Sequence, residues 1–401
     1  MRLIAGVVLA LSSPLAAQAP VTIYASRLLD GKGGQQKDVT VTVDGPRILR
    51  VERGRPEKPP TFDYTGYTIM PGLIDVHTHV TGYINRKGRL HTPDDGDTPA
   101  EAALSAAAGA YATLMAGFTT IQSIGSIDDK DLRDWIDRGD IPGPRMLTSL
   151  EPITDASLTP DQLRAQVRSR VEQGADVIKL FASKSIRDGG TQTLSEEQLR
   201  AACGEAKKLG RRTVVHAHSA ESMRAAVLAG CSQIEHGIFS TPEVLKLMAD
   251  RGTYFGPQCA LIFRNYLDNR PKFEGIGNYN AAGFAAMEKA IPLAIGVVRQ
   301  SASVPNLKLV YGTDAVAGAH GKNAEDLVCR VQQAGHKAMD VLVSATSVNA
   351  TSLEIADRVG SIAPAMQADL IAVKGNPLDD ITTMRRTVFV MKAGKVFRAD
   401  K

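Results

Sequence analysis

The sequence has little of several features that would place it in a simple class. Its 4 cysteines among 401 residues are too few for a disulfide-dense miniprotein. The 47 basic and 43 acidic residues stand in mixed order and leave a net charge of +4, which is no nucleic-acid-binding footprint. Beyond the N-terminus no apolar run approaches the roughly 18 residues of a membrane helix, so we expect no integral membrane segment in the mature chain. With 43% hydrophobic and 22% charged residues, the chain is expected to be neither disordered nor a coiled coil.

The segment 1–19 is typical of a secretory signal peptide. Arg2 precedes an apolar stretch from Leu3 to Leu11, an A-x-A cleavage site ends at Ala19, and no acidic residue occurs before Asp30. A buried first helix is the alternative, but the stretch is short and no polar residue interrupts it. The hypothesis is therefore a secreted or periplasmic protein that is cleaved at Ala19 or a few residues away.

The cysteines are widely spaced and lie in or beside apolar segments. They are Cys203, Cys231, Cys259 and Cys329. They form no C-x-x-C pair, the spacing expected of a zinc knuckle or a redox site. Export would permit disulfides, but we expect all four to be small buried hydrophobic residues.

The middle of the chain repeats one unit, a helix followed by glycine and a short apolar strand. Thr98 to Glu101 is a capping box with proline at the first helical position, and the helix it opens ends at Gly117. The apolar strands are expected at residues 73–79, 119–124, 145–149, 176–182, 213–218, 232–236, 253–257 and 307–313. Such strands, separated by helices, predict an α/β fold, a (β/α)8 TIM barrel whose active site lies at the carboxyl ends of the strands. A doubly wound open sheet is the alternative, but it would not need eight near-equal units.

The flanks differ from the middle, because short β-type runs alternate there with glycine and proline turns. Residues 20–70 and 361–401 are each too short for a separate core, so together they predict one small composite β-sandwich domain. The barrel is then expected at residues 71–360, with two or three helices at 322–357.

Residues able to bind metals stand at the expected strand ends. His77 and His79 lie two apart, so their side chains project to the same side of one strand. Lys179 stands inside an apolar strand, where its ammonium group must be paired, neutralised or modified. An ion pair across the barrel is one interpretation. A carbamate formed with CO2 is the other, since desolvated lysines react as neutral amines.

Three further strands end in the same manner. His216 and His218 share one face of a strand, His236 ends the next strand, and Asp314 ends the last. Each residue has a structural alternative, as a satisfied core histidine or a helix N-cap aspartate. Their shared position at the carboxyl ends of barrel strands favours one metal site.

With these motifs the chain resembles the metal-dependent amidohydrolase superfamily. The resemblance rests on Pro71 to His79 (P-G-L-I-D-x-H-x-H) and on the I-K, H-A-H, I-E-H-G and G-T-D strands, in this order. The tail is also similar, at Asn349-Ala350-Thr351, Gly360-Ser361-Ile362, Ala368-Asp369-Leu370 and Gly375-Asn376-Pro377. The pattern is most similar to the imidazolonepropionase-like branch, with its prolidase-type Xaa-Pro dipeptidases and ochratoxin-hydrolysing carboxypeptidases.

The resemblance implies a role for each of these residues. His77 and His79 would bind the more buried of two divalent metals, His216 and His236 the second, and carbamylated Lys179 would bridge them. Asp314 would bind metal and accept a proton from the bridging water. His218, the second catalytic candidate, would contact the substrate or support the metal ligands from behind. Zinc is the expected metal, although manganese, cobalt and iron also suit such ligands.

Substrate recognition is expected from two basic loops. Tyr83 follows the first strand, Lys184 and Arg187 follow the fourth, and His320 follows Asp314. Either basic loop could hold a carboxylate or carry ordinary solvated charge, and Ala182 to Ser185 replaces the A-T-G-G turn that the branch often uses. We therefore expect a hydrolase of carbon–nitrogen bonds, prolidase- or carboxypeptidase-like, acting on a small carboxylate-bearing substrate. A cyclic amidase or lactonase, a non-catalytic metal-binding scaffold and a homo-oligomer stay open.

Overall fold

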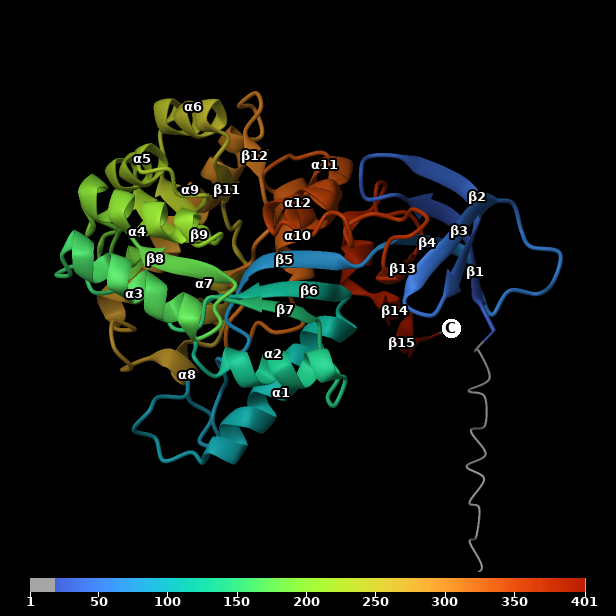
Figure 1. Cartoon of the computed structure of the whole chain (residues 1–401), viewed down its shortest axis with the longest axis horizontal. Helices are drawn as coiled ribbons and strands as arrows, with labels where there is room; N and C mark the ends of the chain where they lie inside the picture. The colour runs from blue at the N-terminus through green and yellow to red at the C-terminus, as the bar shows by residue number, and fades with distance from the viewer. Residues whose placement is uncertain (1–18, 401) are drawn as a thin grey trace, which may run out of the picture.

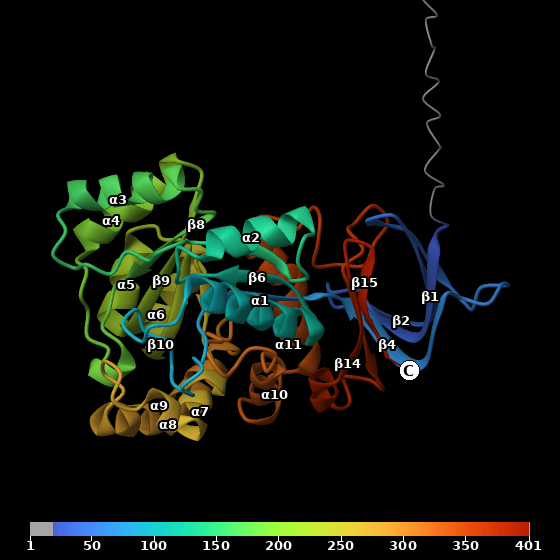
Figure 2. The same ribbon diagram turned by 90° about the horizontal axis from the view of Figure 1, so that it is seen from below.

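The computed structural model describes residues 19–400, and the predicted signal peptide lies almost wholly outside them. Two parts lie side by side (Figures 1 and 2), a barrel with its helices and a β-rich domain made of both chain ends.

The barrel contains the eight strands that the sequence predicts. They are β5 Leu73–Thr78, β6 Phe118–Ser123, β7 Arg145–Thr148, β8 Val177–Phe181, β9 Arg212–Ser219, β10 Gln233–Phe239, β11 Tyr254–Gly256 and β12 Lys308–Leu309. They form a three-stranded sheet, β5-β6-β7, and a five-stranded sheet, β12-β11-β10-β9-β8, which are parallel throughout.

Main-chain contacts join the two sheets at both seams. Ile153 bridges to Leu180 beside β8, and Thr78 bridges to Ala315 beyond β12. The Val76 amide donates to the Tyr311 carbonyl at 3.1 Å across the second seam. The ring is therefore closed, which confirms the barrel and excludes the open sheet.

Helices cover the barrel where capping signals predict them. The first six are α1 Pro99–Met115, α2 Asp129–Arg138, α3 Pro160–Glu172, α4 Glu196–Lys208, α5 Ala220–Leu228 and α6 Pro242–Arg251. The predicted capping box of α1 is present, with both Thr98 and Glu101 bonded. Beyond this helix Gly117 has a φ of +96°, which a glycine adopts at little cost.

The segment between β11 and β12 holds three helices that the sequence analysis did not predict. They are α7 Leu261–Asp268, α8 Arg270–Phe273 and α9 Ala281–Ser301. Among the described residues, α9 is the one helix long and apolar enough to cross a membrane by length and composition. Its sequence had not indicated a membrane helix because charged Glu288 and Lys289 and helix-breaking Pro292 interrupt it. Its buried face packs on α7, so it covers the barrel.

Residues 322–357 are helical as predicted. They form α10 Ala324–Gln332 and a continuous run made of α11 Ala338–Val343, a π-turn at Ser344–Val348 and α12 Asn349–Ser352.

The β-rich domain is one seven-stranded sheet in the order β15-β14-β13-β4-β1-β2-β3. The strands are β1 Val21–Leu29, β2 Gln35–Asp44, β3 Arg47–Arg53, β4 Phe62–Pro71, β13 Leu370–Lys374, β14 Thr387–Lys392 and β15 Lys395–Ala399. The two chain ends meet where β13 pairs antiparallel with β4. The sheet has a core of its own, drawn from both ends, and β4 passes through Gly72 directly into barrel strand β5.

The four cysteines form two disulfides, whereas the sequence favoured a role as small buried hydrophobic residues and left disulfides open. Cys203 in α4 pairs with Cys231, just before β10, and Cys259, just before α7, pairs with Cys329 in α10. All four are buried, as predicted. The partners are 28 and 70 residues apart, so neighbouring units of the closed barrel bring them together and no short motif reveals the pairing.

Candidate metal centre

The strand ends of the barrel bring imidazole, amine and carboxylate groups to one cavity of about 240 Å³. It lies at the carboxyl ends of the strands, where the active sites of such barrels lie. The cavity wall includes every predicted metal ligand and also His218: His77, His79, Lys179, His216, His218, His236 and Asp314.

The first cluster consists of His77, His79 and Asp314. The Oδ1 atom of Asp314 lies 2.9 Å from His79 Nε2 and 3.3 Å from His77 Nε2. Burial opposes ionisation of Asp314, but the charges and hydrogen bonds of His77 and His79 outweigh it and hold the pKa of this carboxyl well below its ordinary range. Asp314 is therefore an anion in a group able to bind a cation.

The turn that carries Asp314 is held by Asp75. The backbone of Asp314 has a φ of +57°, which is uncommon outside glycine and persists where neighbours impose it. Asp75 is fully buried and accepts hydrogen bonds from Thr313 Oγ1 at 2.6 Å and Asn323 Nδ2 at 2.8 Å. Burial raises the pKa of Asp75 to about 6. This aspartate, noted in the sequence only as part of a motif, ties β5 to the turn after β12.

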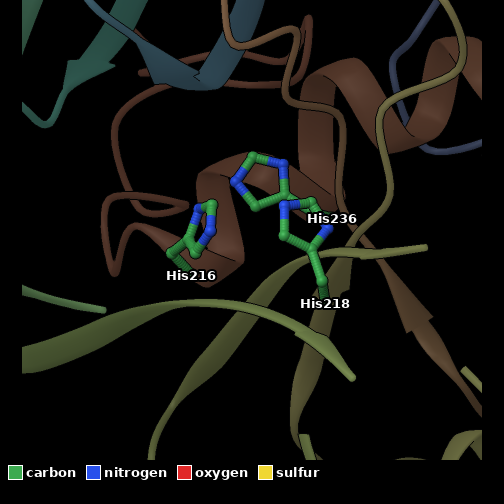
Figure 3. A group of neighbouring side chains, drawn as sticks. All are labelled: His216, His218 and His236. Atoms are coloured by element: carbon green, nitrogen blue, oxygen red, sulfur yellow. The ribbon is translucent and has the colours of Figure 1, made fainter. Parts of the chain in front are cut away.

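The second cluster consists of His216, His218 and His236, whose rings lie together at the ends of β9 and β10 (Figure 3). Ring centroids are 4.4 Å apart for His216 and His236 and 4.9 Å apart for His218 and His236. Burial, reinforced by neighbouring imidazoles, holds the pKa of His216 and of His236 well below the ordinary value, and burial lowers that of His218 to about 3. The rings are therefore neutral, the state in which histidine binds metals.

Lys179 adds an amine to the cavity wall. Its Nζ atom is buried and has no hydrogen-bond partner among the described residues. Burial lowers the pKa of this amine to about 8, so a substantial fraction is neutral near that pH. Of the two interpretations from sequence, an ion pair fails to account for this atom, because no salt bridge to it occurs in the described part of the chain. An unpaired buried amine beside two ligand clusters fits a group that is modified or neutral.

Sequence reasoning assigned no role to Glu235, which lies against a predicted ligand. Its Oε2 atom is 2.7 Å from His77 Nδ1, and both side chains are buried. In a regular strand Glu235 and His236 would face opposite sides, but His236 has a φ of +71°, which breaks the alternation at the strand end. The carboxylate accepts the Nδ1 proton and so directs Nε2, which faces Asp314, to the metal position, where it binds metal once its own proton is lost.

Four substrate-binding residues were expected from the sequence. In the described part of the chain, Arg187 is the one of these that lines the cavity. Tyr83 donates to Asp97 Oδ2 at 3.1 Å, away from the lining. His320 Nε2 lies 2.8 Å from the Gly82 carbonyl oxygen. The side chain of Lys184 is exposed.

One wall of the cavity is apolar and comes mostly from α7. It consists of Ile186, Ile262, Phe263, Tyr266 and Val316. This wall was not predicted from the sequence, because α7 begins without a side-chain cap and was not expected.

Comparison with known proteins agrees with this geometry. Residues 68–397 match the model of the amidohydrolase family. The chain belongs to that family. It is 25% identical to ochratoxinase of Aspergillus niger, over 95% of this chain and 87% of the relative. A solved Xaa-Pro dipeptidase with bound methionine is 29% identical, with a TM-score of 0.84 over 95% of this chain and all (100%) of that one.

A solved prolidase in complex with N-methylphosphonate-L-proline has a TM-score of 0.82 at 24% identity, over 95% of this chain and 100% of that one, and shows the same fold. These findings confirm the family, the branch and the fold expected from sequence. This amidohydrolase is therefore an enzyme that hydrolyses amide or peptide bonds, and it has groups able to hold the metals on which the family depends.

Proposed function

We propose that this amidohydrolase is an exported enzyme with two divalent metals that cleaves the amide bond of a small carboxylate-bearing substrate, as a prolidase or carboxypeptidase does. The observation that carries the proposal is the convergence of a complete ligand set on one cavity: His77, His79, Lys179, His216, His236 and Asp314.

The donor set fits the metals in number and kind. Neutral imidazoles and a carboxylate suit zinc, and they also accept manganese, cobalt or iron. The buried amine of Lys179 lacks a partner in the described part of the chain, and with CO2 it would form a carbamate that offers anionic oxygens to both clusters.

Two divalent cations, when bound, polarise the amide carbonyl and lower the pKa of water toward about 7, so that it is nucleophilic at neutral pH. Asp314, kept ionised by His77 and His79, accepts the proton of the attacking water at a carboxylate oxygen and passes it to the leaving nitrogen. His218 is neutral and lines the cavity, so its ring is placed to hydrogen-bond the substrate.

Arg187 is the residue we assign to the substrate carboxylate. Its Nε atom donates to Asn278 Oδ1 at 2.7 Å, and its guanidinium lies 4.2 Å from the ring centroid of Tyr279. These contacts hold the guanidinium in place beside the cavity, and a fixed guanidinium binds carboxylates with good geometry.

Export is supported by two features of the chain. The segment 1–19 has the composition of a signal peptide, and the four cysteines form two disulfides. Disulfides persist in oxidising compartments such as the periplasm and the extracellular space.

The test is metal analysis of the mature protein together with a kinetic screen of Xaa-Pro dipeptides, other dipeptides, N-acyl amino acids, hydantoins and lactones. The proposal predicts two metal equivalents per chain and hydrolysis of linear amides with a free carboxylate. Preference for hydantoins or lactones would replace it with a ring-opening enzyme. Bound metal without turnover on the whole panel would indicate a binding scaffold.

A further inference from the structure

We propose that Gln258 and the Cys259–Cys329 disulfide are positioning groups for the metal site. They hold Glu235, and through it His77, in the geometry that binds metal. This inference rests on the proposed function, since it concerns the affinity of the first cluster for its cation. It adds residues remote from the cavity to the determinants of metal binding.

Glu235 is held at both carboxylate oxygens. Oε2 accepts from His77 Nδ1 at 2.7 Å and from Gln258 Nε2 at 2.8 Å, and Oε1 accepts from Gln233 Nε2 at 2.6 Å. Gly256 leaves room for this carboxylate, because a Cβ there would come within 2.5 Å of Oε1. Because the bonds to Gln258 and Gln233 fix the orientation of the Glu235 carboxylate, its Oε2 atom stays in place as the acceptor for His77.

Gln258 stands in a short connection that has no regular structure of its own. Residues 257–260 join β11 to α7. The Nε2 atom of Gln258 also donates to the Gly256 carbonyl at 2.9 Å, so two acceptors orient the amide toward Glu235. The position of the amide therefore depends on whatever holds this connection.

Helix α10 holds the connection at three points. Asp326 accepts from the backbone amides of Cys259 at 2.7 Å, Ala260 at 3.0 Å and Leu261 at 2.9 Å. One turn later Cys329 forms the disulfide with Cys259. Arg330 is fully buried and donates from Nη2 to the Pro257 carbonyl at 2.7 Å.

A continuous path of direct contacts thus runs from α10 through the connection to Gln258, Glu235 and His77. The disulfide is its one covalent link between separate elements. Breaking that link leaves the residue next to Gln258 held to α10 only by the hydrogen bond of its backbone amide to Asp326, so the loss is expected at the first cluster.

The other disulfide provides a matched control. Cys203–Cys231 joins α4 to the residue two before β10, at the amino-terminal end of that strand and away from the cavity at the carboxyl ends. Neither of its cysteines is adjacent to a residue that the structure shows bonded to Glu235 or His77, and the nearest such residue, Gln233, stands two positions after Cys231. Both disulfides are buried and close loops within the same barrel, so general stability is affected in both variants.

The experiment compares wild type, Cys259→Ser/Cys329→Ser, Cys203→Ser/Cys231→Ser and Gln258→Met, which keeps the volume of glutamine but lacks its donor. Zinc content and chelator competition give the number of bound metals and the affinity of each site, and circular dichroism confirms folding. The inference predicts that Cys259→Ser/Cys329→Ser and Gln258→Met bind one of the two metals roughly 10- to 100-fold more weakly, as loss of such supporting partners does. The control variant should keep wild-type affinities.

Equal metal affinities in all four proteins would overturn the inference and leave the proposed function intact. Equal weakening in both disulfide variants, with Gln258→Met unaffected, would also overturn it, because the effect would then be one of general stability. A wild-type chain without metal affinity would overturn the proposed function and this inference with it. Should Cys259→Ser/Cys329→Ser fail to fold, the affinity of Gln258→Met decides.

Discussion

The two clusters of the metal centre are held in different ways. In the first cluster, carboxylates position the ligands, since Glu235 holds His77 and Asp75 holds the turn that carries Asp314. In the second cluster, the closest described partner of His216 Nε2 is the Lys184 carbonyl at 3.4 Å, and His218 Nδ1 has none in that part of the chain.

The difference indicates which half of the centre the protein preorganises before metal binds. The first cluster has its hydrogen bonds and its counter-charge in place, whereas the second consists of neutral imidazoles beside an unpaired amine. We therefore expect the first cluster to bind its cation more tightly and the second to depend on the modified lysine. The predictions below test this asymmetry.

The largest expected effect is on turnover in Asp314→Asn. The asparagine keeps an oxygen in the first cluster but cannot accept the proton, so kcat should fall about 10²- to 10⁴-fold. Metal content, measured alongside kcat, should stay near that of wild type. Near-normal turnover in this variant would remove Asp314 from proton transfer.

The next effect concerns the second cluster in Lys179→Ala. Because the proposed carbamate on Lys179 would supply the one anionic donor of this cluster among the described residues, the variant should lose one metal and keep the one held by His77, His79 and Asp314. Metal analysis before and after removal of CO2 from wild type should give the same change. Two metals retained in both tests would rule out the carbamate bridge.

A smaller effect is expected for the substrate in Arg187→Met. Hydrogen bonds to charged groups contribute about 1.5–3 kcal/mol, so KM for a carboxylate-bearing substrate should rise roughly 10- to 100-fold with little change in kcat. Lys184→Met is the matched control, since that side chain is exposed outside the cavity lining. If the two variants have equal KM values, Arg187 has no special role.

The smallest effect concerns stability and the buried carboxyl of Asp129. Burial raises the pKa of Asp129 to about 6, because its hydrogen-bond donors are hydroxyl groups such as Thr148 Oγ1, which carry no charge to offset the burial. Asp314 differs, since the imidazoles beside it lower its pKa. A raised pKa stabilises the fold fully below the unfolded value near 4, and the contribution is lost as pH rises through about 6. About 1.3 kcal/mol of this contribution is lost between pH 5 and pH 7, at roughly 1.4 kcal/mol for each pKa unit.

The Tm of Asp129→Asn should therefore fall less between pH 5 and pH 7 than the Tm of wild type. The same fall in Tm for both proteins would show that Asp129 is ionised throughout this range.

The sequence predicted most of the fold and both ligand clusters because their signals are local. A strand of alternating residues ends in His77 and His79 whatever the rest of the chain does, and a capping box at Thr98 starts a helix wherever it occurs. Features that depend on closure of the barrel were missed. The cysteine pairs and the contact of Glu235 with His77 join distant segments. Helix α9, which packs on the cavity wall, was not predicted because it contains Pro292.

The most direct test of the account is a titration of zinc into the metal-free mature chain while hydrolysis of an N-acyl amino acid is followed. The asymmetry predicts two binding steps, with little activity at one equivalent, when the first cluster is filled, and full activity at two. Full activity at one equivalent, or hydrolysis by the metal-free chain, would contradict the account.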